Sequence, residues 1–350
     1  MPDRRQTRHL AQRSARSWPM RRREILKGPA AALLGCVMAG AQRASAQPRT
    51  LPVIGYLGSE TPERVASRLA AFRTGLADTG LVEGRDVAIA YRWADGRYEQ
   101  LPALAKELVG HGIAVLVAPG GAPVVLAARA ATETIPIVFE MGGDPVVLGL
   151  VDDLARPRGN LTGVSSLSVE VSNKRLEFMK ELFPTADILA VAINPTSPTV
   201  GSQLVGLRTA ADSLGVRLHL LEASREDVFE ALFTEPRRLG IPGLVFTSDP
   251  FFAYRSEYLA MLAIRYGLPA ITQSRDFPIA GGLMSYGGDF AQSHRQAGVY
   301  VGRVLKGEPP GDLPVQLVTR VELFANMKAA SRLGMTVPPS ILSSADGVIE

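Results

Sequence analysis

Two hydrophobic patterns alternate along the chain after residue 50. Short, nearly continuous apolar runs, such as 53–57 and 114–118, are typical of strands buried on both faces of a parallel sheet. Between such runs, apolar residues recur every three or four positions, as at Val65, Leu69 and Phe72, and this spacing predicts amphipathic helices. Strands that alternate with helices of this length predict a parallel sheet with helices on both faces.

The same alternation begins again near residue 188. Apolar runs at 188–193, 217–222 and 244–247 predict three more strands, with helix-like spacing between them. The order of elements in the second half repeats that of the first. We therefore predict an α/β fold with two similar doubly wound parallel-sheet lobes and a ligand cleft between them.

Two segments are expected to connect these lobes. The first is 159–164 and the second is 280–288, where two Gly-Gly pairs allow unusual backbone angles. From these crossings we assign residues 51–163 and 283–314 to lobe 1, and residues 164–282 and 315–350 to lobe 2. The sequence leaves open which lobe holds the C-terminal tail.

Residues 1–46 follow a different pattern, which we interpret as an export signal. Arg22-Arg23 precedes an apolar stretch from Pro29 to Ala41, and Ala44-Ser45-Ala46 provides a cleavage site with small residues. The apolar stretch is too short to cross a bilayer core of ~30 Å. The twin arginine resembles a twin-arginine export signal, although the general secretory route and a start at Met20 instead of Met1 stay open. We expect a periplasmic protein that begins at Gln47.

The single cysteine, Cys36, supports an alternative reading of this signal. Leu33-Leu34-Gly35-Cys36 looks like a lipoprotein cleavage box, which would leave a lipid-anchored Cys36 at the N-terminus. With cleavage after Ala46 the mature chain has no cysteine and needs no disulfide. Roughly 300 residues bury a large core without one.

Removing residues 1–46 reverses the net charge. They hold ten of the 38 Lys and Arg residues and two of the 34 Asp and Glu residues, so the remainder has 28 basic and 32 acidic residues. The net charge is then −4, against +4 for the whole chain. No basic excess is left to indicate binding to nucleic acid, and we expect none.

The candidate ligand-binding residues follow predicted strands or lie at the second crossing. In open parallel sheets, ligands bind beyond the carboxyl ends of the strands. Small residues there let backbone N–H groups at helix N-termini approach a carboxylate. The candidates are Ser59, Gly121, Glu140, Asp144, Thr196, Asp249 and Tyr286.

These candidates differ in expected role. Asp249 or Glu140 would pair with a ligand ammonium group, and Tyr286 lies between the two glycine pairs of the second crossing. Each also has a structural interpretation. Ser59, Thr196 and Asp249 suit helix N-caps, and Gly121 suits a tight turn.

Signatures of an enzyme are scarce. The four histidines are far apart and lack metal-ligand spacing, and there is no Gly-x-Ser-x-Gly elbow or Walker loop. Asp144 and Asp249 each precede a proline, and a hydrolase could pair them, although Asp is also common in such turns. We expect no catalytic activity, no cofactor and no metal.

Five further segments stand out, in this order: 135–146, 154–163, 281–287, 305–315 and 345–350. Together they resemble a family of ABC-transporter substrate-binding proteins. The family has the periplasmic binding protein type I fold, and some members are of a tryptophan or tyrosine type. This chain departs from the usual pattern at Arg158, where glycine is usual, at Gln316, where glutamate is usual, and at Ala325 and Ala329.

The resemblance implies the exported solute-binding component of an ABC importer, which captures a small ligand by hinge closure. We expect an amino acid or a related carboxylate. The implied partner is an ABC permease with its ATPase, which would be the contact with the membrane unless Cys36 carries a lipid. We expect a monomer. A ligand-sensing module for a receptor, or an α/β hydrolase or transferase, are the alternatives.

Overall fold

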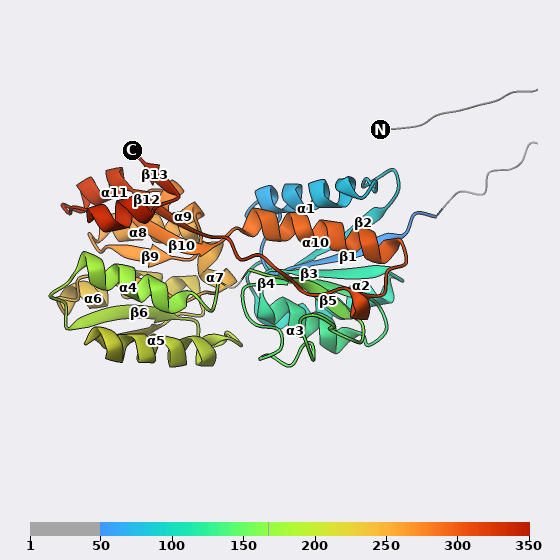
Figure 1. Cartoon of the computed structure of the whole chain (residues 1–350), viewed down its shortest axis with the longest axis horizontal. Coiled ribbons are helices and arrows are strands. Elements are labelled where there is room, and N and C mark those ends of the chain that lie inside the picture. Colours follow the sequence, from blue (N-terminus) through green and yellow to red (C-terminus); the bar gives the residue numbers. More distant parts are fainter. Residues whose placement is uncertain (1–49, 167) are drawn as a thin grey trace, which may run out of the picture. The chain divides into compact units, whose positions relative to one another are not determined.

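The computed structural model describes residues 50–166 and 168–350. The predictions on residues 1–46, which include Arg22, Cys36 and Ala46, therefore lie outside the described residues. The described chain forms two α/β lobes, each built around its own sheet (Figure 1).

The described strands of lobe 1 form a six-stranded sheet in the order β11-β5-β4-β3-β1-β2, and all its pairs are parallel. The strands are β1 (Val53–Gly58), β2 (Ala88–Trp93), β3 (Val115–Pro119), β4 (Ile137–Met141), β5 (Leu161–Ser165) and β11 (Gln316–Leu317). Helices α1 (Ala66–Asp78) and α10 (Phe290–Leu305) cover one face, and α2 (Leu101–Gly110) and α3 (Ala122–Ala131) cover the other (Figure 1). Short 3₁₀ turns lie at Tyr98–Gln100 and Pro310–Asp312.

The sheet of lobe 2 has seven strands within the described residues, in the order β13-β12-β10-β9-β8-β6-β7. Its strands are β6 (Ile188–Ile193), β7 (Arg217–Glu222), β8 (Leu244–Phe246), β9 (Ala270–Thr272), β10 (Met284–Gly288), β12 (Val321–Asn326) and β13 (Gly347–Ile349). One face packs on α4 (Ser172–Leu182), α5 (Val200–Leu214), α11 (Met327–Arg332) and α12 (Pro339–Ser344). The other packs on α6 (Phe229–Arg238), α7 (Pro250–Ala253), α8 (Ser256–Arg265) and α9 (Asp276–Ile279), with a 3₁₀ turn at Glu226–Val228 before α6. Only β10 and β12 are antiparallel among the described pairs.

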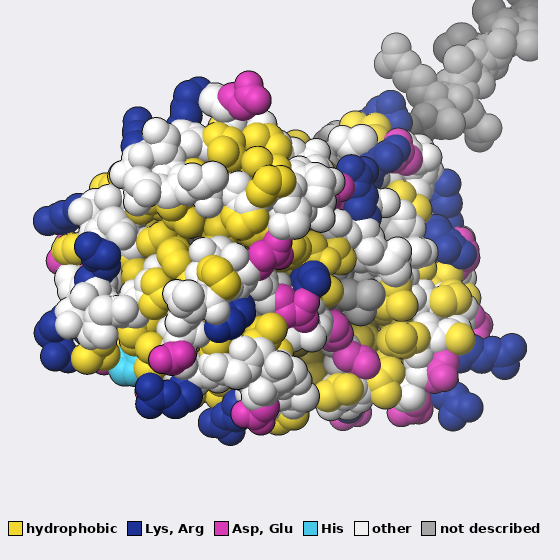
Figure 2. All heavy atoms as spheres, turned by 60° about the vertical axis from the view of Figure 1, so that its left-hand side comes forward, with side chains coloured by type: hydrophobic (Ala, Val, Ile, Leu, Met, Phe, Trp, Pro, Cys, Tyr) yellow, Lys and Arg dark blue, Asp and Glu magenta, His cyan; other side chains and the backbone are white. Residues whose placement is uncertain are grey.

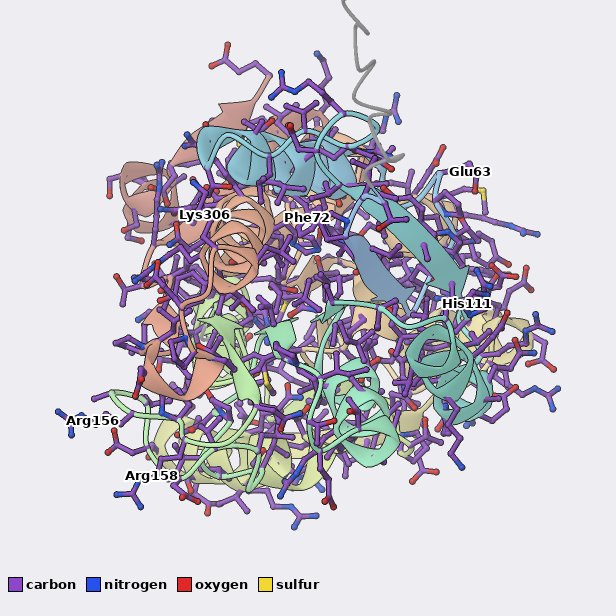
Figure 3. The ribbon with its side chains drawn as sticks, turned by 90° about the vertical axis from the view of Figure 1, so that its right-hand side faces the viewer. Glu63, Phe72, His111, Arg156, Arg158 and Lys306 are labelled. Carbon is purple, nitrogen blue, oxygen red and sulfur yellow. The ribbon has the colours of Figure 1, made fainter. Side chains whose placement is uncertain are left out.

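The prediction of two doubly wound lobes is therefore confirmed, and the reason is visible in the core. Because helices cover both faces, the inner strands β3 and β6 are apolar at successive positions and buried along nearly their whole length. The helices on lobe 1 also pack closely. A Cβ atom at Gly298 would overlap the carbonyl oxygen of Phe72 in α1, so the missing side chain lets α10 approach α1 (Phe72 is labelled in Figure 3).

The chain crosses between the lobes after β5, after β10 and after β11. The sequence places residues 283–288 with lobe 1, but β10 pairs with β9 and β12 of lobe 2. It places 315–317 with lobe 2, but β11 pairs with β5 of lobe 1. The pattern of a short strand does not determine its hydrogen-bonding neighbours. The lobe boundaries expected after residues 282 and 314 therefore lie a few residues later, at the ends of β10 and β11. The tail strands β12 and β13 belong to lobe 2.

The surface shown in Figure 2 mixes both signs of charge. Lys and Arg side chains are interspersed with Asp and Glu side chains and with apolar patches on this face. Such a surface provides no extended field of one sign.

Candidate ligand-binding site

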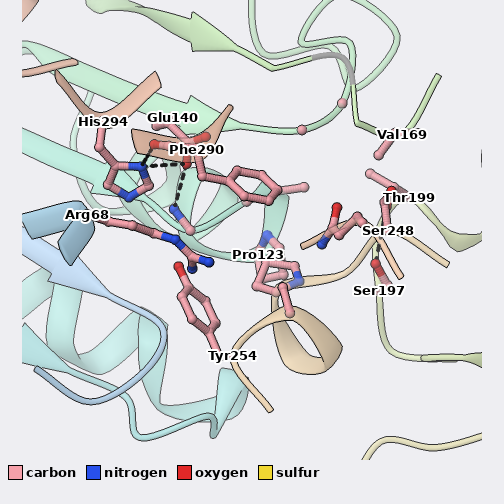
Figure 4. Close-up of a pocket in the computed structure, with 18 residues that line it drawn as sticks. Arg68, Pro123, Glu140, Val169, Ser197, Thr199, Ser248, Tyr254, Phe290 and His294 are labelled. Atoms are coloured by element: carbon pink, nitrogen blue, oxygen red, sulfur yellow. Dashed lines mark hydrogen bonds and ion pairs between the residues drawn. The ribbon is translucent and has the colours of Figure 1, made fainter. Parts of the chain in front are cut away.

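A pocket lies between the lobes, where strands of both sheets end (Figure 4). Its empty space, which includes space open to solvent, is about 520 Å³. Lobe 1 contributes Arg68 from α1, residues 120–123 around the start of α3, Glu140 from β4, and Phe290 and His294 from α10. Lobe 2 contributes Ser197 and Thr199 before α5, Ser248, Pro250 and Tyr254 after β8, and Gln273 after β9.

Glu140 forms the acidic part of the wall. Its side chain is buried, and Oε2 accepts a hydrogen bond from the Gly120 N–H at 3.4 Å. Oε1 has no hydrogen-bond partner among the described residues. Burial raises the pKa of Glu140 to about 7. A buried carboxylate oxygen that lacks a donor favours a ligand that brings one, and an ammonium group does so with opposite charge.

His294 supports Glu140 without contributing a charge. Its Nδ1 donates to the carbonyl oxygen of Phe290 at 2.8 Å and lies 3.9 Å from Glu140 Oε2. Burial, with the nearby Arg68 charge, lowers the pKa of His294 to about 3. The imidazole is therefore neutral at physiological pH and adds no counter-charge for Glu140. The charge that stabilises the Glu140 carboxylate is that of Arg68.

Arg68 is the cation of this wall and already has a partner. Its Nη2 lies 2.9 Å from Oδ2 of Asp276 at the start of α9 in lobe 2. Its guanidinium also lies over two aromatic rings, 4.7 Å from the centroid of Tyr254 and 5.1 Å from that of Phe290. The planar guanidinium stacks favourably there. Arg68 thus bridges the lobes, and its guanidinium packs on the two aromatic rings beside the pocket.

The opposite wall, from lobe 2, is made of neutral hydrogen-bonding groups. The hydroxyls of Ser197 and Thr199 lie 3.2 Å apart (Figure 4), and Gln203 Nε2 donates to Thr199 Oγ1 at 3.1 Å. The fifteen-residue helix α5 starts directly after Thr199. Hydroxyl groups beside a helix N-terminus suit an anionic group such as a carboxylate.

Further contacts join the lobes beside the pocket. The Tyr98 hydroxyl of lobe 1 donates to Oδ1 of Asp249 at 3.0 Å, and Glu60 Oε1 lies 3.0 Å from Arg255 Nη1 of lobe 2. At Gly121, with φ +91°, a Cβ atom would come within 2.7 Å of the Pro250 ring. Only glycine accommodates both that backbone angle and this close approach.

Two of the predicted site residues, Gly121 and Glu140, line the pocket. Ser59 is buried beneath Gly120, and its hydroxyl lacks a partner in the described structure. The Thr196 hydroxyl donates to Asn194 Oδ1 at 2.8 Å, and Asp144 Oδ1 accepts from the N–H of Val146 at 2.7 Å. Ser59, Thr196 and Asp144 do not belong to this wall.

Asp249 and Tyr286 also lie outside the wall. Asp249 is the N-cap of α7 and accepts from the Phe251 N–H at 2.9 Å, while its Oδ2 has no partner among the described atoms. The Tyr286 ring packs edge-on against Phe178, at 5.2 Å between centroids, inside lobe 2. The N-cap interpretation from the sequence therefore describes the geometry of Asp249.

Sequence reasoning missed Arg68, Tyr254, Phe290 and His294, because it searched loops and these residues lie on or beside helices. The sequence nevertheless contained an indication of two of them. His294 falls on the same buried stripe of α10 as Ala297 and Val301, and Arg68 falls beside Leu69 on that of α1. A charged or polar residue on such a stripe needs a partner or a function.

Residues 50–166 and 168–350 contain no group of three or more His, Cys, Asp or Glu side chains arranged to hold a metal ion. They also contain no helix with the length and hydropathy needed to cross a membrane.

Two lobes with mostly parallel sheets, crossing segments between them and a pocket at the strand ends define a two-lobed binding protein of the periplasmic binding protein type I fold. The model of the family "ABC transporter substrate binding protein" matches residues 62–349, and the chain belongs to this family. It is thus an extracytoplasmic solute-binding protein of an ABC transporter and not an enzyme. The resemblance in the sequence is confirmed.

Three similar proteins place the chain within this fold. A "Tyrosine-binding protein" from Clostridioides difficile is 26% identical over 75% of this chain and 75% of the relative. A conserved domain protein from Vibrio cholerae is 27% identical, with a TM-score of 0.78 over 85% of this chain and 99% of that structure. A domain from Streptococcus pneumonia in complex with L-Trp is 23% identical, with a TM-score of 0.77 over 86% of this chain and 100% of that structure.

Proposed function

We propose that this protein captures an amino acid between its lobes, aromatic amino acids being the first candidates, and delivers it to an ABC importer. The observation that carries the proposal is the unpaired Glu140 Oε1 in the pocket wall. A buried carboxylate oxygen without a donor is costly, and a ligand ammonium group would supply the donor and the opposite charge. The tyrosine-binding relative and the L-Trp complex support this ligand class.

The ligand would bridge the two walls. Its ammonium group pairs with Glu140 of lobe 1, and its carboxylate accepts from the hydroxyls before α5 in lobe 2. The rings of Tyr254 and Phe290 offer aromatic surfaces to a side chain. Since the two charged ends contact different lobes, the ligand binds most tightly when the lobes are closed. That differential affinity drives hinge closure.

The remaining proposals come from the sequence. Residues 1–46 direct export by the twin-arginine route, the mature chain begins at Gln47, and the monomer works with a permease and its ATPase. Mass spectrometry of the exported protein tests the start. A first residue of Gln47 supports it, and a diacylated Cys36 would make the protein lipid-anchored instead.

The ligand is tested by calorimetry on protein purified after export. L-tyrosine and L-tryptophan are compared with 3-(4-hydroxyphenyl)propionate and indole-3-propionate, which lack the ammonium group. We expect the amino acids to bind at least ~30-fold more tightly, because loss of one partner of a desolvated charge pair typically costs ~2–5 kcal/mol. Equal affinity for the deaminated acids would contradict the role of Glu140.

A further inference from the structure

Arg175 is the largest fully buried side chain of the described structure and does not line the pocket. It lies in the first turn of α4, directly after the first crossing. Its Nη2 donates to the hydroxyls of Ser172 at 2.7 Å and Ser248 at 2.6 Å, and its Nη1 donates to the carbonyl oxygen of Tyr286 at 2.8 Å. Its Nε has no partner among the described atoms.

All these partners are neutral, which sets Arg175 apart. Three arginines are buried in the described chain. Arg68 pairs with Asp276 at 2.9 Å, and Arg255 pairs with Glu60 at 3.0 Å. Among residues 50–166 and 168–350, no carboxylate forms an ion pair with Arg175. Burial lowers its pKa to about 9, which reflects the cost of an uncompensated charge.

The contacts of Arg175 hold its charge behind one wall of the pocket. Ser248, which accepts from the guanidinium, lines the pocket. The Ser248 N–H donates to Gln203 Oε1 at 2.6 Å, and Gln203 Nε2 donates to Thr199, also in the wall. The bond to Tyr286 lies at the second crossing. Since Arg175 is anchored at both crossings, its guanidinium cannot turn away to find another anion.

We propose that Arg175 is a positioning residue that selects an anionic group. Its fixed guanidinium has no carboxylate partner, and its charge attracts the ligand carboxylate, across Ser248, to the wall that contains Ser197 and Thr199. Ser248 itself donates to the carbonyl oxygen of Ser168 and to Gln203, so the attraction acts through space. The inference rests on the proposed function, and it assigns the carboxylate end of the ligand to lobe 2. The charge acts across one side chain in a buried site, where charge interactions are screened much less than in water. The ligand is then the missing counter-ion of Arg175.

The test compares each amino acid with its amide. Calorimetry gives the dissociation constants of L-tyrosine and L-tyrosinamide, and of L-tryptophan and L-tryptophanamide, for the exported protein and its variants. Arg175→Met removes the charge, Arg175→Gln keeps donors without charge and guards against misfolding, and Arg175→Lys restores the charge. Arg265→Met is the matched control, because Arg265 is exposed on α8 of the same lobe and pairs with Glu230.

We expect the unaltered protein to prefer the acid to the amide. In Arg175→Met and Arg175→Gln this preference falls about tenfold or more, because the charge that attracts the carboxylate across Ser248 is gone. Arg175→Lys retains most of it and Arg265→Met retains all of it. A merely structural role would weaken acid and amide equally, and that result overturns the inference.

The measurements also distinguish a failure of the proposed function from a failure of the proposal on Arg175. Amino acids that bind no better than the deaminated acids contradict the pairing with Glu140, while a preference for the acid over the amide that needs Arg175 still supports this inference. An unaltered protein that binds none of these compounds overturns both proposals.

Discussion

At the scale of single residues, the pocket combines buried charges that are stable only with a partner. Glu140 has an unpaired oxygen and a pKa raised by burial to about 7. The folded protein therefore holds this proton more tightly than the unfolded chain does. The stability from the protonated form is fully present below the ordinary pKa of about 4.5 and is lost as the pH rises through about 7.

Glu140→Gln removes the cost of ionising a buried carboxyl group. It also removes the negative charge that would pair with the ligand ammonium group. At pH 8 we expect the ligand-free variant to have a larger free energy of unfolding than the unaltered protein, by on the order of 1–3 kcal/mol, and the gain should vanish below pH 4.5. L-tyrosine should bind at least ~30-fold more weakly. Urea unfolding at both pH values and calorimetry measure these effects. A stability difference independent of pH would show that Glu140 is not the titrating group.

Asp249 should behave as a cap. Asp249→Ala removes the acceptor for the Phe251 N–H and for the Tyr98 hydroxyl, so we expect a loss of about 0.5–2 kcal/mol of unfolding free energy and a much smaller loss of affinity than in Glu140→Gln. Asp249→Asn, which keeps a capping oxygen, is the control. Unchanged urea unfolding with a large loss of affinity would assign the ligand ammonium group to Asp249 instead.

At the scale of elements, close helix packing depends on glycine. Gly298→Ala would place a Cβ against the Phe72 carbonyl oxygen, and we expect a cost of about 1–3 kcal/mol as α10 is forced away from α1. Gly206→Ala in α5 is the matched control, because its Cβ meets open space, and it should stabilise by about 0.5–1 kcal/mol through better helix propensity. Urea unfolding measures the change in unfolding free energy for both variants. Equal changes in the two variants would contradict the packing argument.

The loop before β5 contains a second element-scale prediction. Arg158, where glycine is usual in the family, has a left-handed φ of 60°. Arg158→Gly should therefore raise the free energy of unfolding by up to about 1 kcal/mol, since glycine adopts this angle without strain. Arg156→Gly changes the same charge in the same exposed loop (Figure 3) without that angle and should be neutral or slightly destabilising. Thermal and urea unfolding measure both; a loss in Arg158→Gly would contradict the prediction.

At the scale of the whole molecule, the proposed function requires that two lobes share one ligand and that the chain is exported. Contacts already join the lobes around the pocket, from Arg68 to Asp276 and from Glu60 to Arg255. A ligand that pairs with Glu140 and with the lobe 2 wall adds to them. In the proposed function, the closed form that the ligand stabilises is the form that a permease would recognise.

Export is tested by changing Arg22 and Arg23 to Lys. We expect the precursor to accumulate in the cytoplasm, because the twin-arginine route requires both guanidinium groups. Arg43→Lys, also within residues 1–46 but outside the pair, should leave export unchanged. Immunoblots of cytoplasmic and periplasmic fractions measure the distribution, and a normal periplasmic yield of the double variant would rule out this route.

The sequence by itself determined the class of fold, the family and two residues of the pocket wall. Hydrophobic periodicity is a local property, so it identified parallel strands such as β3 and β6. The rule that ligands bind at strand ends identified Gly121 and Glu140. These inferences need only the neighbours of a residue along the chain.

Tertiary structure decided the rest. The lobes of β10 and β11 depend on which strands they pair with, and no local pattern contains that information. Arg68 and His294 reached the pocket because α1 and α10 pack side by side over one sheet, more than 200 residues apart in sequence. Arg175 is unpaired because folding buried it among neutral groups. Burial and pairing arise from contacts distant in sequence, and so only the folded chain fixes them.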